Sequence, residues 1–170
     1  MFKTMGPPKP TKYAPLICTL AMVSAAIGIV VGLIKGNPLW IIICLFPAVL
    51  YEIYRTQGVS TKWASWGMLL ILVAEIFLIT QDVNFNLAEF LGRDSAYVGG
   101  QYVQLGDIKS LGSSMLAVIA MILAVRTAGI YTKWLAGIIL VSSLALIFSL
   151  DPVLFGDLLK SVVETIFDLL

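Results

Sequence analysis

The hydrophobic pattern along the chain is a series of long apolar runs separated by short polar stretches. Several runs approach or exceed about 18 residues, which is the length of a transmembrane helix. The pattern predicts an all-α integral membrane protein whose transmembrane domain covers residues 16–151. We expect five transmembrane helices in it, at about residues 16–34, 39–54, 63–80, 111–125 and 134–150.

The two ends of the chain differ from this domain. Residues 1–15 hold four prolines and three lysines, which predict an extended arm rather than a helix. A signal peptide is disfavoured because the apolar run continues past Ala25. At the other end, Asp151-Pro152 is a helix-start signal. Residues 152–170 carry their polar side chains on one face, which predicts an amphipathic helix on the membrane surface or against a partner.

The longest polar stretch runs from Gln81 to Lys109. Capping-box-like spacing from Asn86 to Glu89 predicts a short surface helix at about 87–91, and Gly99-Gly100 predicts a turn. The carboxylates of this stretch lack the spacing of a calcium-binding loop, so we interpret them as solvated.

A nine-residue segment occurs twice. Arg55–Trp63 and Arg126–Trp134 are identical at six of nine positions, and each lies between two apolar runs. Extending the alignment to 55–80 and 126–151 gives ten identities in 26 positions. The pattern indicates an internal repeat of two helical hairpins that enter the membrane in the same direction, with the first helix outside the repeat.

Basic residues are distributed unequally between the two sides of the predicted helices. One side holds seven and the other four, and positive-inside bias therefore places the N-terminus in the cytoplasm and the C-terminus outside a cell membrane. The seven are Lys3, Lys9, Lys12, Arg55, Lys62, Arg126 and Lys133.

Small residues predict one helix-packing face in the first helix. Ser24, Gly28 and Gly32 recur every four positions, which lets another helix approach closely in lipid. In the second helix, Pro47 predicts a kink, and Glu52 is expected to form a local ion pair with Arg55 three residues later.

Glu75 is the strongest candidate for a functional residue, because it is an ionisable side chain inside a predicted transmembrane helix. A carboxylate there costs roughly 2.5–3.5 kcal/mol on insertion scales. One hypothesis is a proton or cation site. The structural alternative is a protonated or hydrogen-bonded carboxyl facing a helix that carries Ser or Thr. The sequence shows no second deep acid for a relay.

Four basic residues of the repeat, Arg55, Lys62, Arg126 and Lys133, are candidates for contacts to anionic lipid or to an acidic partner. The alternative is that they only snorkel and anchor the helices.

Composition narrows the function classes. The chain has 170 residues, is 59% hydrophobic, carries a net charge of +1 and has no histidine. Without histidine, the commonest ligand for haem, copper and zinc and the commonest general base are missing. Cys18 and Cys44 lie within apolar runs and are expected to pack as small apolar residues. We therefore expect no catalytic residue, metal, cofactor or nucleic acid.

Two functions remain. The favoured one is a non-catalytic, accessory or structural integral membrane subunit of a larger complex, which includes the case of a subunit of a membrane enzyme complex. Its partners would be the lipid bilayer and other integral membrane subunits. The alternative is a small homo-oligomeric proton or cation transporter or channel that uses Glu75.

Overall fold

The computed structural model describes residues 12–56, 58–83, 95–98, 101–104, 108–127, 129–153, 155–156 and 160. Within this part of the chain, five long helices and one pair of short strands occur. The helices are α1 (Ala14–Lys35), α2 (Leu39–Arg55), α3 (Val59–Thr80), α5 (Ile108–Arg126) and α6 (Ile130–Leu150), and the strands are β1 (Ser95–Val98) and β2 (Gln101–Gln104).

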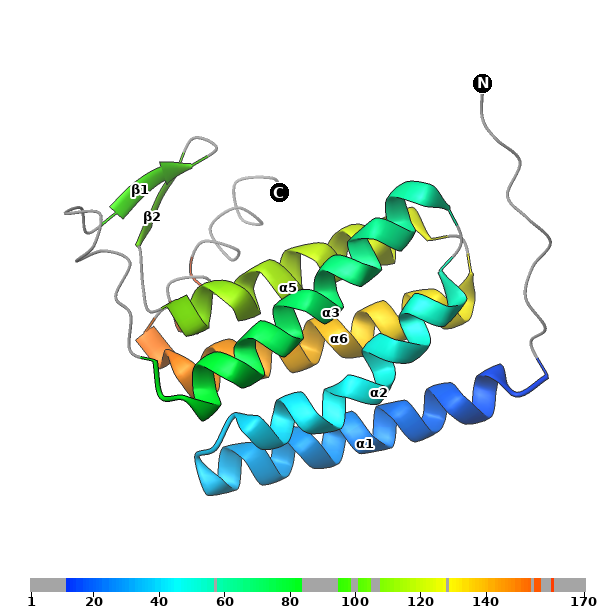
Figure 1. Ribbon diagram of the computed structural model, residues 1–170, viewed down its shortest axis with the longest axis horizontal. Helices are drawn as coiled ribbons and strands as arrows, with labels where there is room; N and C mark the ends of the chain where they lie inside the picture. Colours follow the sequence, from blue (N-terminus) through cyan, green and yellow to red (C-terminus); the bar gives the residue numbers. More distant parts are fainter. Residues whose placement is uncertain are drawn as a thin grey trace.

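Four helices form a closed bundle, and the first helix lies outside it. In the ring, α2 contacts α3, α3 contacts α5, α5 contacts α6, and α6 contacts α2. Helix α1 packs along α2 and α6 (Figure 1). The connections α2–α3 and α5–α6 lie at the same end of the bundle, near the beginning of α1 (Figure 1). The turn between α1 and α2 and the strands lie toward the other end.

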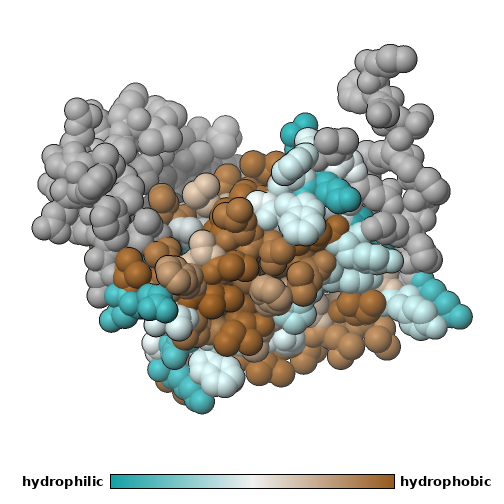
Figure 2. Space-filling model, viewed as in Figure 1, coloured by the Kyte–Doolittle hydropathy of each residue, from teal (hydrophilic) through white to brown (hydrophobic). Residues whose placement is uncertain are grey.

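The architecture is that of a helical membrane protein. Helices α1, α3, α5 and α6 are each long and apolar enough to cross a membrane. Helix α2 has 17 residues and is not one of the four, so the fifth crossing stays a prediction. Pro47 lies inside α2, and the helix continues through it. On the face shown in Figure 2, hydrophobic residues cover the middle and hydrophilic ones lie toward the ends.

Helices α1, α3, α5 and α6 begin earlier than the apolar runs predict, whereas α2 begins at the predicted residue. Helix α1 starts at Ala14, because Pro15 is tolerated in a first turn, where its missing N–H has no intrahelical partner. Helices α3 and α6 start at Val59 and Ile130, four residues before the predicted bounds. Much of the repeated segment is therefore helical, and the connections that it forms are short.

One pair of short strands lies in the polar stretch between α3 and α5. Strands β1 and β2 pair antiparallel, with Tyr97 opposite Tyr102 and Val98 opposite Gln101. Tyrosine and valine favour strands, and Gly-Gly is typical of a two-residue hairpin loop. The predicted turn at 99–100 and surface helix at 87–91 lie outside the described residues. Of the predicted helix 152–170, residues 152, 153, 155, 156 and 160 are described, and they are helical.

The small-residue face of α1 packs on α2. A Cβ atom added to Gly28 would overlap the Cβ of Cys44 and lie 3.1 Å from the Trp40 carbonyl oxygen. A Cβ added to Gly32 would overlap the Ile41 side chain. One turn earlier, the Ser24 hydroxyl donates a hydrogen bond of 3.1 Å to the Cys44 carbonyl. This face therefore brings α1 and α2 of one chain into close contact.

Gly28→Ala should weaken this contact. The added methyl group meets a Cβ and a backbone carbonyl, neither of which can move away cheaply, so we expect the free energy of unfolding to fall by about 1–3 kcal/mol. The measurement is thermal unfolding in detergent, followed by circular dichroism. Gly67→Ala is the control, because a Cβ there meets no described atom within 4 Å. Equal stability of the two variants would contradict the close contact.

Candidate functional site

Glu75 lies within the interface between α3 and α5. Its side chain is 1% exposed, and Oε1 accepts a hydrogen bond of 2.6 Å from the hydroxyl of Ser113, which is itself fully buried. The other oxygen, Oε2, has no hydrogen-bond partner among the described residues. The carboxyl thus faces a serine on a neighbouring helix of the same chain.

A glycine makes room for this carboxyl. A Cβ added to Gly112 would lie 2.9 Å from Oε1 and 3.0 Å from Cγ of Glu75. Near the same end of the two helices, the Lys109 ammonium forms a 3.2 Å ion pair with Asp82, which follows α3. Helices α3 and α5 are therefore joined by a buried hydrogen bond and by a partly buried ion pair.

Glu52 is a second buried carboxyl, for which the sequence predicts only a local ion pair. Its side chain is fully buried, and Oε1 accepts a hydrogen bond of 2.9 Å from the Thr56 hydroxyl. The predicted ion pair with Arg55 is wrong: both residues are described, and their side chains form none. A second enclosed carboxyl therefore exists. Its signal was the Glu-x-x-x-Thr spacing, which puts acceptor and donor one helical turn apart.

Arg55 has aromatic neighbours instead. Its guanidinium carbon lies 5.9 Å from the centre of the Tyr51 ring and 5.4 Å from that of Tyr131, and Nη1 lies 3.5 Å from the Tyr51 hydroxyl, to which it donates. Cations over aromatic faces at this range are attracted by the ring electrons. Because Tyr131 belongs to the second copy of the repeat, Arg55 links the two copies.

The repeated glycines and threonines form helix starts. The Thr61 hydroxyl donates to the Gly58 carbonyl at 3.2 Å, and the Thr132 hydroxyl donates to the Gly129 carbonyl at 2.7 Å. A Cβ at Gly58 or Gly129 would lie 2.8 or 2.9 Å from the corresponding threonine oxygen. This local geometry accounts for the Gly-x-x-Thr part of the repeat without any ligand.

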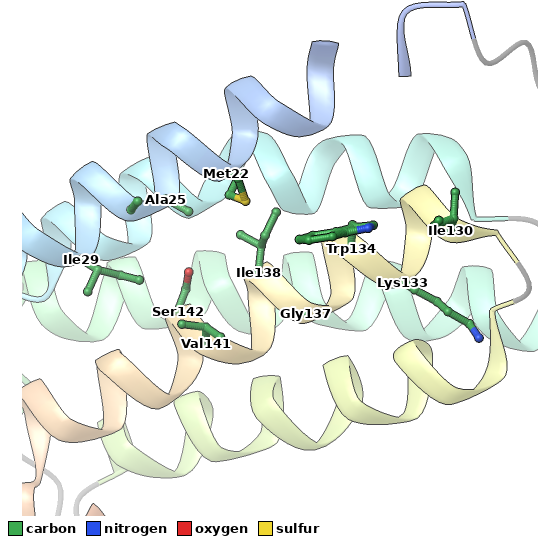
Figure 3. Close-up of a pocket in the computed structure, with 11 residues that line it drawn as sticks. Met22, Ala25, Ile29, Ile130, Lys133, Trp134, Gly137, Ile138, Val141 and Ser142 are labelled. Atoms are coloured by element: carbon green, nitrogen blue, oxygen red, sulfur yellow. The ribbon is translucent and has the colours of Figure 1, made fainter. Parts of the chain in front are cut away.

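The other basic candidates of the repeat do not form one site with Arg55. Lys62, Arg126 and Lys133 are exposed, whereas Arg55 is half-buried. One of the three, Lys133, borders a cavity of about 630 Å³ between α1 and α6. The close-up in Figure 3 shows the α6 side of that cavity along one face of the helix. Lys62 occupies the same position in the repeat but is not among the residues that line this cavity.

The next feature is the arrangement of potential metal ligands among the described residues. No group of three or more histidine, cysteine, aspartate or glutamate side chains in them could hold a metal ion. The arrangement can provide internal hydrogen bonding at two carboxyls, and it presents an apolar surface bordered by exposed cations.

Comparison of the chain with protein families, curated proteins and solved structures gives no match.

Ser113→Ala should destabilise the fold by about 0.5–2 kcal/mol, the range for an interhelical hydrogen bond in a membrane. The substitution leaves both oxygens of Glu75 without a partner among the described residues. Chemical unfolding in mixed micelles would measure the change. Ser114→Ala is the matched control, because that hydroxyl donates to Ser110 within its own helix.

Chemical unfolding of Ser113→Ala in a Glu75→Leu background isolates the contribution of the hydrogen bond between these two side chains. Ser113→Ala should then cost little, because the acceptor is gone. An unchanged cost would show that the hydrogen bond contributes nothing.

Proposed function

We propose that the chain is a non-catalytic, accessory or structural subunit of a larger membrane protein complex, and that it contributes helix packing and contacts to lipid or to partners. In this proposal α2 is a fifth crossing. The N-terminus lies in the cytoplasm and the C-terminus outside the cell membrane, as the basic residues at one end of the bundle favour.

The observation that carries the proposal is the use of the two buried carboxyls inside the chain. Glu75 accepts from Ser113 across the α3–α5 interface, and Glu52 accepts from Thr56, which follows α2 directly. Neither carboxyl lines the cavity between α1 and α6. A pore shared between copies would need such a group on an outer face. Both are enclosed within one protomer, which favours a role in holding the bundle together.

The outer faces of the bundle offer apolar surface to neighbours. Helix α3 is an example, because large side chains recur along one exposed face of it. The two tryptophans on this face suit the lipid interface, and the aliphatic and phenyl side chains suit lipid tails or a packed subunit. The exposed residues of this face are Trp63, Trp66, Leu70, Val73 and Phe77.

A duplicated hairpin is part of the proposal. The α2–α3 and α5–α6 connections lie at one end of the bundle, as a parallel repeat requires (Figure 1). The Lys62 and Lys133 amides each donate a 3.0 Å hydrogen bond to the glycine carbonyl four residues earlier. The two helices thus begin with the same backbone hydrogen bond at equivalent positions.

Purification from the native membrane in mild detergent tests the proposal. We expect the protein to co-purify with other integral membrane subunits in fixed proportion, as measured by mass spectrometry of the intact assembly. A matched purification of an unrelated membrane protein with the same tag identifies contaminants. A homo-oligomer with no other subunit would contradict the proposal.

A proton or cation transporter is the second candidate. It is favoured by the Oε2 atoms of Glu75 and Glu52, which have no hydrogen-bond partner among the described residues. An acceptor left open in a buried carboxyl could take up a proton or a cation.

Flux into liposomes separates the two candidates. The subunit proposal predicts that wild type and Glu75→Gln both give background proton and cation flux, because Glu75 is used for packing. An ionophore added at the end provides the control for vesicle integrity. Flux in the wild type that disappears in Glu75→Gln would favour the transporter.

A further inference from the structure

The cavity between α1 and α6 runs along the helices and has a cation near one end. Helix α1 contributes Met22, Ala25 and Ile29, whereas Lys133 and Ser142 lie far apart on α6 (Figure 3). Every other lining residue is apolar or aromatic: Ala26, Ile130, Trp134, Gly137, Ile138 and Val141. The volume of about 630 Å³ is typical of a site for a small molecule.

A glycine contributes to the hollow. Gly137 lies between Trp134 and Val141 on the lining face of α6, and a Cβ added there meets no described atom within 4 Å. Trp134 and Val141 are 57% and 58% exposed, so the cavity is a groove that opens to the outside of the bundle. A molecule could enter it laterally, from lipid.

The length of the groove corresponds to one leaflet. Lys133 and Ser142 are nine residues apart, which is about 13 Å along a helix. One leaflet contributes about half of the 30 Å hydrocarbon core, or roughly 15 Å. Lys133 is in the first turn of α6, at the connector end, where a head group would lie. A partner transmembrane helix would instead follow the groove and continue across both leaflets.

We propose that this groove binds one acyl chain of an anionic phospholipid, with its head group held by Lys133. The inference rests on the proposed function, because it requires the connector end of the bundle to lie at a membrane interface. Charge complementarity selects an anionic over a zwitterionic head group. The apolar lining accommodates the chain, and the Trp134 ring lies along the groove beside it (Figure 3).

The end of the groove that lies farther from Lys133 allows an acyl chain to be distinguished experimentally from other amphiphiles. Ser142 is 1% exposed, and its hydroxyl has no hydrogen-bond partner among the described residues. In Figure 3 its oxygen is directed toward α1. The end of an acyl chain carries no polar atom, so this hydroxyl should not contribute to binding. An amphiphile with a second polar group would use it.

The test is native mass spectrometry of the purified, delipidated protein after titration with phosphatidylglycerol or phosphatidylcholine. Wild type should retain one phosphatidylglycerol in preference to phosphatidylcholine. Lys133→Gln should reduce that retention about five-fold, the effect of one near-surface lysine. Lys62→Gln is the matched control, since it removes the corresponding charge of the repeat away from the groove, and it should leave retention unchanged. Equal losses in both variants would overturn the assignment.

Filling the groove gives an independent test. Gly137→Phe should abolish retention of the lipid, whereas Gly67→Phe makes the same change on α3, where a Cβ also meets no described atom within 4 Å. Circular dichroism of both variants would verify that they are folded. Retention by folded Gly137→Phe would place the lipid elsewhere. Ser142→Ala should have no effect, and a loss of binding would overturn an acyl chain as the occupant.

These outcomes are separate from those of the proposed function. Lipid retention is measured on the purified chain alone, so it can fail while native subunits still co-purify. Absence of native subunits, with specific lipid retention intact, would contradict the complex and leave the groove assignment standing.

Discussion

Close approach between helices is the constraint on which the rest of this structure depends. In lipid, burial of apolar side chains gives little drive for helix association, so packing and hydrogen bonds between helices must provide it. Gly28 and Gly32 let α1 lie against α2, and Gly112 lets α5 lie against the Glu75 side chain. The position of α1 on α2 and α6 then leaves the groove along α6. A structural contact therefore creates the surface on which binding is proposed.

The buried carboxyls follow from the same constraint. An ionisable group inside the membrane is expensive, and its cost falls when the group finds a partner within the protein. Ser113 donates to Glu75 from the neighbouring helix, and Thr56, the residue that follows α2, donates to Glu52. Both carboxyls are buried, and the hydrogen bond of Glu75 joins two helices of one chain. This internal use agrees better with a packing subunit than with a pore formed between copies.

Features set by local sequence could be predicted, and features set by contacts between distant segments could not. The helices follow from apolar runs, and the packing face of α1 follows from its four-residue spacing of small residues. The helix starts were placed late, because polar residues such as Lys62 are compatible with a first helical turn. The three-residue spacing from Glu52 to Arg55 predicts a local ion pair, but burial of the Glu52 side chain depends on the tertiary fold and leaves no such local signal. The groove depends on α1 meeting α6, more than a hundred residues later.

The two copies of the nine-residue segment show how position in the fold gives equivalent residues different roles. Their glycines and threonines form the same hydrogen bonds at the helix starts. Their cations differ: Arg55 lies beside Tyr51 and Tyr131, whereas Arg126 is exposed. Lys133 borders the groove and Lys62 does not. Helix α1 explains the difference between the lysines, because it has no counterpart in the repeat and packs along α6, where the cavity that Lys133 borders lies. A helix outside the repeat thus breaks the symmetry, so that one of the two equivalent lysines borders the groove.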